Sequence, residues 1–205
     1  MMENITRLME KGTPVSILIS NEKGTESPLL YCELVHKARY GESFMITSQG
    51  CSVCEYVFCY TENSPEDYYN STGRYKNHKA TSNAVSSLKR FEIKGRSIRI
   101  TPFKGDKGEK FDVLILYLRP VRAMRIIQAH AFLEGEQIKI KTGGIASICS
   151  DCTVNPLRGK LSFSLGCKGS RKHSKYGDDE VIVGIPFELA KDIDEALGKI
   201  PETLS

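Results

Sequence analysis

Short runs of apolar residues, either continuous or alternating with polar ones, predict the strands of this chain. Asp112–Leu118 carries a continuous apolar run, as expected for a central strand that is covered on both faces. Ser97–Thr101 alternates Ile98 and Ile100 with polar neighbours, which is typical of a half-buried strand. The predicted strands are Pro14–Ser20, Ser43–Thr47, Ser97–Thr101, Asp112–Leu118, Gln137–Lys141, Leu161–Leu165 and Val181–Ile185.

Longer segments with an apolar stripe predict helices between these strands. Ser27–Arg39 is typical, because Ser27 can cap it and Pro28 suits its first turn. The other predicted helices are a short one near the N-terminus, Cys51–Tyr60, Ala80–Leu88, and helices that begin at Pro120, after Gly143–Gly144 and at Pro186. The polar segment Glu62–Lys79, rich in tyrosine, predicts a long surface loop, with or without one helical turn. The pattern indicates a mixed α/β fold, with about seven strands and helices packed on the sheet.

The chain also contains a weak internal similarity. The matched pairs are His36/His130, Gly41/Gly135, Ile46/Ile140 and Gly50/Gly144. We expect a single domain over residues 1–205, in which residues 12–95 and 96–205 form two strand–helix–strand–helix halves that share a mixed sheet. A true duplication would relate the halves by a pseudo-twofold axis. Chance matching of two common units is the alternative.

Composition narrows the class of protein. The 205 residues are 40% hydrophobic and 26% charged, which is ordinary for a globular chain. No apolar run approaches the roughly 18–20 residues that span a bilayer, and Met1–Lys11 lacks the apolar centre of a signal peptide. We therefore expect a cytoplasmic protein without membrane contact. A net charge of +4 is too small to indicate nucleic-acid binding. The sequence is compatible with a monomer and with a homo-oligomer.

Seven cysteines are the main chemical signal. In a reducing compartment, clustered cysteines more often bind metal or do redox chemistry than form disulfides. Cys51/Cys54 and Cys149/Cys152 are each three residues apart, so on an α-helix each pair would share a face. Four such thiolates can hold zinc or an iron–sulfur cluster. The alternative is that several, Cys59 above all, are small buried apolar side chains and that there is no cofactor.

Other candidate groups are two histidines and a basic stretch. His36 and His130 lie on predicted helices, where each is a candidate for supporting a metal ligand or transferring a proton; a partly buried structural histidine is the alternative. Lys168, Arg171 and Lys172 follow Cys167 closely, so this stretch is either an anion-binding site or a solvated loop.

Several stretches together resemble a known family. They are Tyr31-Cys32, Ala38-Arg39-Tyr40-Gly41-Glu42, Ala123-Met124-Arg125-Ile126-Ile127, Cys149-Ser150-Asp151, Ser164-Leu165-Gly166-Cys167 and Asp178-Asp179-Glu180. The chain thereby resembles, over nearly its whole length, the uncharacterised family called domain of unknown function 169, found in archaea and anaerobic bacteria.

The resemblance implies a particular set of cysteines but no established activity. Relatives share cysteines at positions 32, 51, 149 and 167, and tend to have glycine or alanine at positions 54, 59 and 152. The implied metal ligands are therefore Cys32, Cys51, Cys149 and Cys167, with Cys54 and Cys152 as alternatives from local spacing.

Three hypotheses follow. The first is an iron–sulfur protein with an electron-transfer or redox accessory role and a redox protein partner. The second is a binding or regulatory module in which zinc joins the two halves. The third is a thiol-dependent enzyme, with Cys149 or Cys51 as nucleophile and His36 or His130 as base.

Overall fold

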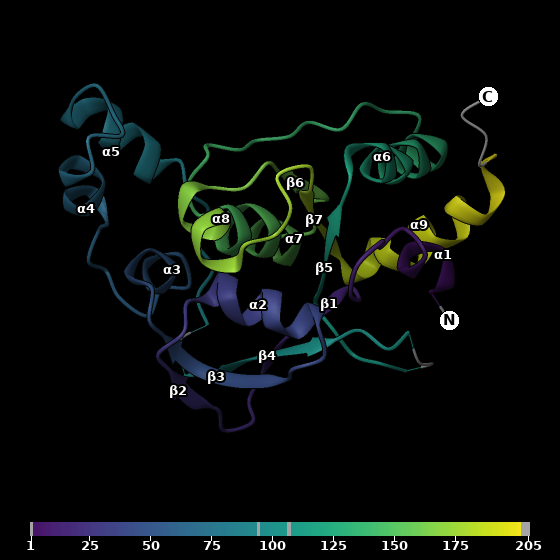
Figure 1. Cartoon of the computed structure of the whole chain (residues 1–205), viewed down its shortest axis with the longest axis horizontal. Coiled ribbons are helices and arrows are strands. Elements are labelled where there is room, and N and C mark those ends of the chain that lie inside the picture. Colours follow the sequence, from purple (N-terminus) through teal and green to yellow (C-terminus); the bar gives the residue numbers. More distant parts are fainter. Residues whose placement is uncertain (1, 94, 106–107, 202–205) are drawn as a thin grey trace.

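One seven-stranded sheet organises the protein in the computed structural model, which describes residues 2–93, 95–105 and 108–201 (Figure 1). The strand order is β2-β3-β4-β1-β5-β7-β6. Only β2 and β3 pair in parallel, and the other neighbours are antiparallel, so the sheet is mixed as predicted. The strands are β1 (Val15–Ser20), β2 (Thr25–Ser27), β3 (Phe44–Gln49), β4 (Ser97–Pro102), β5 (Val113–Leu118), β6 (Ser162–Ser164) and β7 (Val181–Pro186).

Strand β5 separates two hydrophobic cores, and all six of its residues are buried. Alternate side chains of a strand point to opposite faces. Val113, Ile115 and Tyr117 accordingly belong to one core, whereas the intervening Leu114, Leu116 and Leu118 belong to the other. The continuous apolar run is thus explained, since helices cover this strand on both faces.

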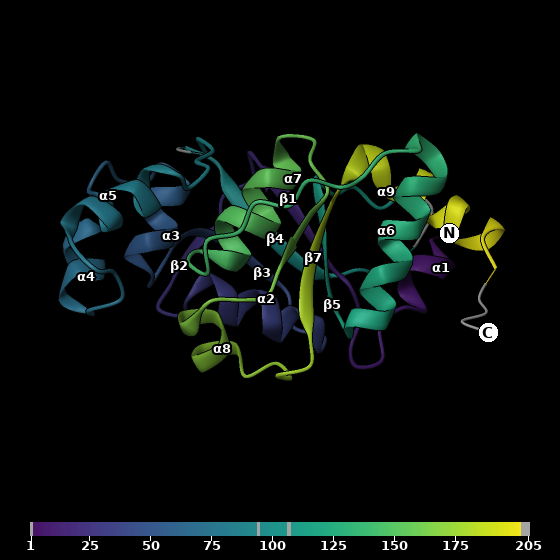
Figure 2. The same ribbon diagram turned by 90° about the horizontal axis from the view of Figure 1, so that it is seen from above.

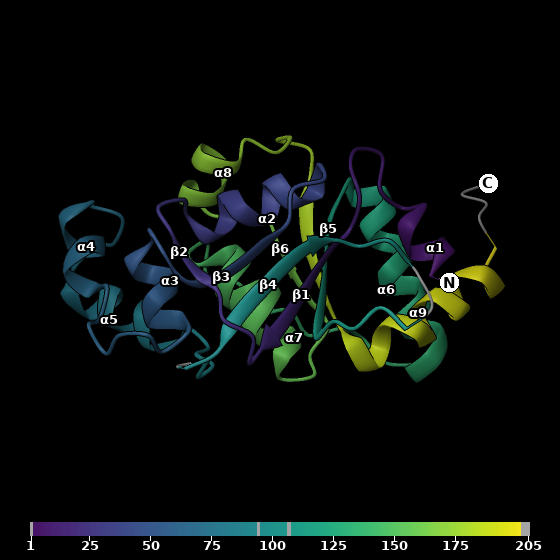
Figure 3. The ribbon, with the colours of Figure 1, turned by 90° about the horizontal axis from the view of Figure 1, so that it is seen from below.

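The helices divide between these two cores. The first core contains residues of α2 (Tyr31–Arg39), α3 (Ser52–Val57) and the π-helix η1 (Ser147–Val154). The second contains residues of α1 (Glu3–Thr6), α6 (Pro120–Glu134) and α9 (Phe187–Lys199), which lie together at one end of the molecule (Figure 2, Figure 3). Helices α4 (Glu66–Ser71) and α5 (His78–Ser86) occupy the opposite end.

Helix α2 begins later than the sequence predicts. Ser27 belongs to β2 and does not cap the helix. Leu30 is the N-cap, and the Glu33 carboxylate accepts a hydrogen bond from the Leu30 amide at 2.8 Å. Residues 25–27 therefore add a short edge strand that the sequence pattern did not predict.

The prediction of a strand at Gln137–Lys141 is wrong. This segment follows Gly135, which ends α6 in a left-handed conformation, and it runs without regular structure along the surface. Ile140 is 44% exposed, so the alternation of apolar side chains does not correspond to a buried face. The predicted number of strands is right only because β2 replaces this segment.

The helix predicted after Gly143–Gly144 is the π-helix η1, and every residue of it is buried. Gly184 of β7 makes this packing feasible, because a Cβ atom there would lie only 2.3 Å from the carbonyl oxygen of Cys152. The short helix α7 (Asn155–Leu157) follows η1 directly. The basic stretch after Cys167, for which a loop was one expectation, forms helix α8 (Lys168–Ser174).

The structure does not confirm the internal duplication. Ile46 lies in β3, whereas its matched residue Ile140 lies in no strand. The helices that carry His36 and His130, α2 and α6, pack into different cores on opposite faces of β5. The described part of the chain contains no helix with the length and apolar character needed to cross a membrane.

Candidate functional site

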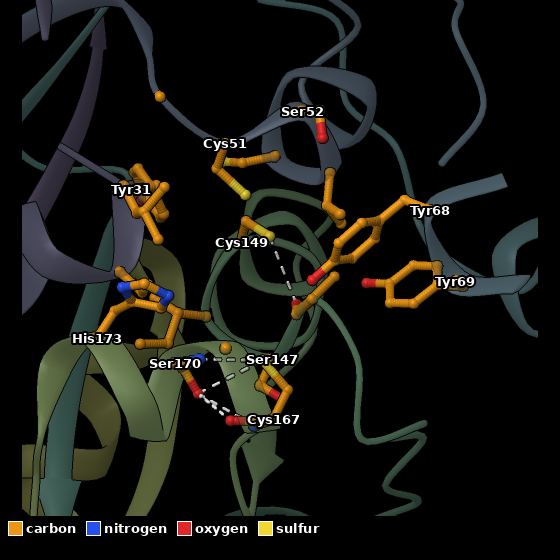
Figure 4. Close-up of a pocket in the computed structure, with 18 of the residues that line it drawn as sticks. Tyr31, Cys51, Ser52, Tyr68, Tyr69, Ser147, Cys149, Cys167, Ser170 and His173 are labelled. Atoms are coloured by element: carbon orange, nitrogen blue, oxygen red, sulfur yellow. Dashed lines mark hydrogen bonds between the residues drawn. The ribbon is translucent and has the colours of Figure 1, made fainter. Parts of the chain in front are cut away.

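The four cysteines implied by the resemblance line a single cavity of about 310 Å³ (Figure 4). They come from four separate segments: Cys32 from α2, Cys51 from the start of α3, Cys149 from η1 and Cys167 from the start of α8. Cys54 lines the same cavity. The fold therefore brings into one place thiols that are far apart in the sequence.

Cys32 lies in the first turn of α2 beside the end of α8. The Ser174 hydroxyl donates a hydrogen bond of 2.8 Å to the Cys32 carbonyl and so ties the two helices together. Burial raises the pKa of the Cys32 thiol to about 12, and Cys149, Cys51 and Cys167 add to this effect. Cys32 is therefore a neutral thiol near neutral pH unless a bound cation stabilises its thiolate.

Cys51 is held by the side chain of Gln49. The Gln49 amide oxygen accepts from the Cys51 backbone amide at 2.9 Å, and its nitrogen donates to the Cys51 carbonyl at 3.1 Å. Burial and then the nearby Cys149 raise the pKa of the Cys51 thiol to about 11, although the amides of Val53 and Cys54 favour the thiolate. Cys51 is thus fixed in place just before helix α3.

Cys149 points into the cavity from the buried π-helix (Figure 4). Its thiol donates to the carbonyl of Ala146 at 3.6 Å. Ala146 itself has φ 50°, a left-handed conformation that alanine rarely adopts. Both π-helices and unusual backbone conformations concentrate at functional sites, which directs attention to this segment.

The surroundings of Cys167 favour its thiolate. Burial works against ionisation, but hydrogen bonding with Ser170 and Ser147, including donation from both of their backbone amides, outweighs it and lowers the pKa of Cys167. The Ser170 amide lies 3.3 Å from the sulfur. Ser170 is held in turn by a 2.9 Å hydrogen bond between its hydroxyl and that of Tyr176.

In the π-helix η1, the side chains of Cys149 and Cys152 point in different directions. A π-helix takes more residues per turn than an α-helix, so residues three apart no longer share a face. The Cys152 thiol instead donates to the Ile182 carbonyl at 3.5 Å, and Cys152 does not line the cavity. In the other pair, Cys54 is 1% exposed beside the cavity, and burial and then Cys149 raise its pKa. Cys59 is half-buried rather than buried, with φ 57°.

The two histidines that the sequence singled out lie elsewhere. The ring of His36 packs edge-on against Tyr40 and Tyr117, and His130 lies on α6. Among the described residues, the cavity lining includes neither of them but does include His173, whose Nδ1 is 3.9 Å from the Glu33 carboxylate.

The basic stretch of α8 serves partly as a structural support. Arg171 donates to the carbonyls of Leu165, Gly177 and Glu180, and its guanidinium lies over the Tyr176 ring. Lys168 and Lys172 are exposed and do not line the cavity. Arg171 therefore holds the segment that follows α8 in place.

Further lining residues were not found by sequence reasoning. They are Tyr68, Tyr69, Arg74, Ser147, Ser170 and His173. Two signals were available: the tyrosine-rich composition of Glu62–Lys79, which predicts a surface loop with or without one helical turn, and the basic stretch after Cys167, which contains His173. Residues 66–71 form α4, and Tyr69 is only 3% exposed.

The thiols line one cavity but, among the described residues, do not form a recognisable site for a single ion. Within residues 2–93, 95–105 and 108–201, no three His, Cys, Asp or Glu side chains are grouped so that they could hold one metal ion. Zinc binds thiolates at about 2.3 Å, so four of them must approach one another closely. A cluster of several irons with bridging sulfide accepts thiolates from a wider ring.

A mixed α/β fold with a cavity lined by cysteines defines the class of protein. The model of the family domain of unknown function 169, described as uncharacterised ArCR, matches residues 5–196, and the chain belongs to this family. The chain is also 27% identical over 177 residues to the uncharacterised protein MJ0308 of Methanocaldococcus jannaschii, an alignment that covers 82% of this chain and 75% of that protein. No solved structure matches the chain significantly.

Proposed function

We propose that the cavity binds an iron–sulfur cluster through Cys32, Cys51, Cys149 and Cys167, and that the protein has an electron-transfer or redox accessory role. The observation that carries this proposal is that the four thiols, from four separate segments, line one cavity. Cysteine thiolates are the usual ligands of iron–sulfur clusters. A redox protein partner and a reducing, cytoplasmic location belong to the same proposal.

The size of the cavity favours a cluster over zinc. A volume of about 310 Å³ far exceeds what one ion needs. The described side chains include no group of three that could ligate a single ion. A zinc ion that joins the two halves remains the alternative, and it would require the thiols to move together.

Hydrogen-bond donors beside the sulfurs also support the proposal. The amides of Ser147 and Ser170 donate to the Cys167 sulfur, and those of Val53 and Cys54 favour the thiolate of Cys51. Such donors stabilise the negative charge of a thiolate-bound cluster and raise its reduction potential. Cys54 is a fifth thiol that lines the cavity, and it is an alternative ligand.

Anaerobic purification of the full chain, followed by iron and sulfide analysis and visible spectroscopy, tests this function. Serine substitution of Cys32, Cys51, Cys149 or Cys167 should abolish or strongly reduce the iron content. Cys152→Ser is the matched control, since Cys152 is buried but outside the cavity. Protein that stays free of iron after anaerobic reconstitution would refute the cluster, and one zinc per chain would establish the alternative.

A thiol-dependent enzyme is the second candidate, and the hydrogen bonds at Cys167 favour it. Two backbone amides that donate to one sulfur, those of Ser147 and Ser170, favour the reactive thiolate form. Cys167 would be the nucleophile in place of Cys149 or Cys51, and His173, which lines the cavity, would replace His36 or His130 as the nearby base. The rate of iodoacetamide alkylation against pH tests this candidate. A Cys167-dependent rate that stays high below about pH 7.5 would support it.

A further inference from the structure

The wall of the cavity opposite the thiols consists of aromatic rings and one arginine. Tyr68 and Tyr69 of α4 and the following Arg74 line this side. The Tyr68 and Tyr69 hydroxyls point towards the side where Cys149 lies (Figure 4). The cavity therefore has two chemically distinct ends, one of sulfur and one of rings and positive charge.

Arg74 has a hydrogen-bonding group that the protein leaves unused. Its Nε atom is buried and has no hydrogen-bond partner in the part of the chain that the structure describes. The guanidinium lies 5.5 Å from the Tyr69 ring centroid and 5.9 Å from that of Tyr68, so the rings hold it by cation–π contact. Because Arg74 also lines the cavity, the rings hold its positive charge where the carboxylate of a bound ligand could pair with it.

Tyr69 offers a second polar group beside it. The side chain is 3% exposed, and its ring packs against Tyr68 and Tyr75 at centroid distances of 5.1 and 6.1 Å. Among the described residues its hydroxyl has no recorded hydrogen-bond partner, and a tyrosine hydroxyl carries its proton at neutral pH. Tyr69 is therefore a protonated donor facing the space between the arginine and the thiols.

Apolar side chains line the cavity between these two ends. Leu30, Val53 and Ile148 contribute to it. Small-molecule sites are mostly apolar, with a few placed polar groups, and begin at volumes of about 300 Å³. The cavity matches that description, and its size suits a small molecule rather than a polymer.

We propose that this cavity binds a small organic carboxylate with an apolar body, whose carboxylate pairs with Arg74 and Tyr69 and whose body extends towards the cysteines. The planar guanidinium matches a carboxylate in shape as well as charge. The proposal rests on the proposed function only in that a cluster held by the four cysteines would lie beside the apolar body of the ligand. Binding itself depends only on the wall formed by Arg74 and the tyrosines.

Calorimetric titration of the full chain with benzoate, and with the neutral benzamide of the same shape, tests this inference. Benzoate should bind at one site per chain and roughly tenfold or more tightly than benzamide. Arg74→Gln should remove this preference, Arg74→Lys should retain part of it, and Tyr69→Phe should weaken benzoate binding. Arg7→Gln is the matched control, because Arg7 is an exposed arginine outside this cavity.

Three outcomes would overturn the proposal: equal binding of benzoate and benzamide, unchanged benzoate affinity in a folded Arg74→Gln variant, and tighter Arg74-dependent binding of inorganic phosphate. Thermal melting shows whether each variant folds, and Arg74→Lys provides the test if Arg74→Gln does not.

A Cys51→Ser variant separates this inference from the cluster. Benzoate binding that persists in metal-free Cys51→Ser supports the carboxylate site whether or not the wild-type protein contains iron. Wild-type protein that contains iron and sulfide but does not distinguish benzoate from benzamide would retain the cluster and refute the carboxylate site.

Discussion

Arg39 and Glu180, which are 141 positions apart, form a buried two-pronged ion pair. The guanidinium uses both terminal nitrogens, lies 4.8 Å from the Tyr117 ring centroid and donates from Nε to the Lys11 carbonyl at 2.9 Å. Glu180 also accepts from the Gly177 amide at 2.7 Å. The pair fixes α2, which carries Cys32, to the segment that leads into β7. Two family-like stretches of the sequence thus contain the partners of one contact.

Breaking this pair should strongly destabilise the protein. Glu180→Gln leaves the Arg39 charge buried without its partner, which costs roughly 3 kcal/mol or more. Denaturant unfolding measures the loss, and the exposed Glu42→Gln, which breaks only the surface pair with Lys37, should cost less than about 1 kcal/mol. Similar losses in the two variants would contradict the importance of the buried pair.

The same pair predicts an acid-sensitive component of stability. Although burial opposes ionisation, the Arg39 side chain and the Gly177 amide lower the pKa of Glu180. Because the pKa is lowered in the folded state, this carboxylate stabilises the protein at pH values above the unfolded-state pKa of about 4.3. The stabilisation is lost as the pH falls through the folded-state pKa. Unfolding free energies measured from neutral pH down to about 3 should therefore fall less steeply in Glu180→Gln than in wild type.

For Asp151 we expect the opposite dependence of stability on pH. Burial raises the pKa of this carboxyl from near 3.8 to about 6, although Thr142 and Ser164 donate hydrogen bonds of 2.8 and 3.0 Å to it. Because the pKa is raised in the folded state, this carboxyl contributes its full stabilisation below the unfolded-state pKa of about 3.9. That stabilisation is lost as the pH rises through about 6. Asp151→Asn should remove this loss, worth roughly 3 kcal/mol, and be at least as stable as wild type at neutral pH. Asp178→Asn, at an exposed carboxylate, is the control and should change little.

Metal loading should release protons. The pKa values of about 12 for Cys32 and about 11 for Cys51 mean that both thiols carry protons at neutral pH, whereas metal ligands are thiolates. Anaerobic titration of the apoprotein with ferrous iron and sulfide, in weak buffer with a pH indicator, should release about two or more protons per site beyond those of the reagents. The apparent affinity should rise with pH. A Cys32→Ser variant should release fewer protons, and an unchanged release would exclude Cys32 as a ligand.

Gly184 should be intolerant of any side chain. A Cβ atom at this position would lie 2.3 Å from the carbonyl oxygen of Cys152, so Gly184→Ala must displace η1 from β7, at a cost of about 1–3 kcal/mol. At Gly143 a Cβ would meet only the Ile145 side chain, at 3.9 Å, so Gly143→Ala is the matched control. Thermal unfolding compares the two, and equal melting temperatures would contradict the tight packing of η1.

Local patterns in the sequence predicted most of the regular elements. The apolar run of β5 and the prolines at the start of α6 and α9 each depend on neighbouring residues, so they could be recognised without a tertiary structure. The pattern failed at Gln137–Lys141, where alternation of two isoleucines had no sheet to join. It also missed β2, a three-residue strand that exists only through its pairing with β3.

The candidate site divides in the same way. The sequence by itself singled out the cysteines as the candidate chemical groups, and resemblance to a family selected Cys32, Cys51, Cys149 and Cys167 among them. Only the tertiary structure decided that these four line one cavity, that π-helical winding turns Cys152 away, and that Tyr69 and Arg74 form the opposite wall. Periodicity and spacing are properties of neighbouring residues, whereas a cavity arises from contacts between segments far apart in the chain. The helix type at Cys149 likewise depends on how closely Gly184 lets a distant strand approach.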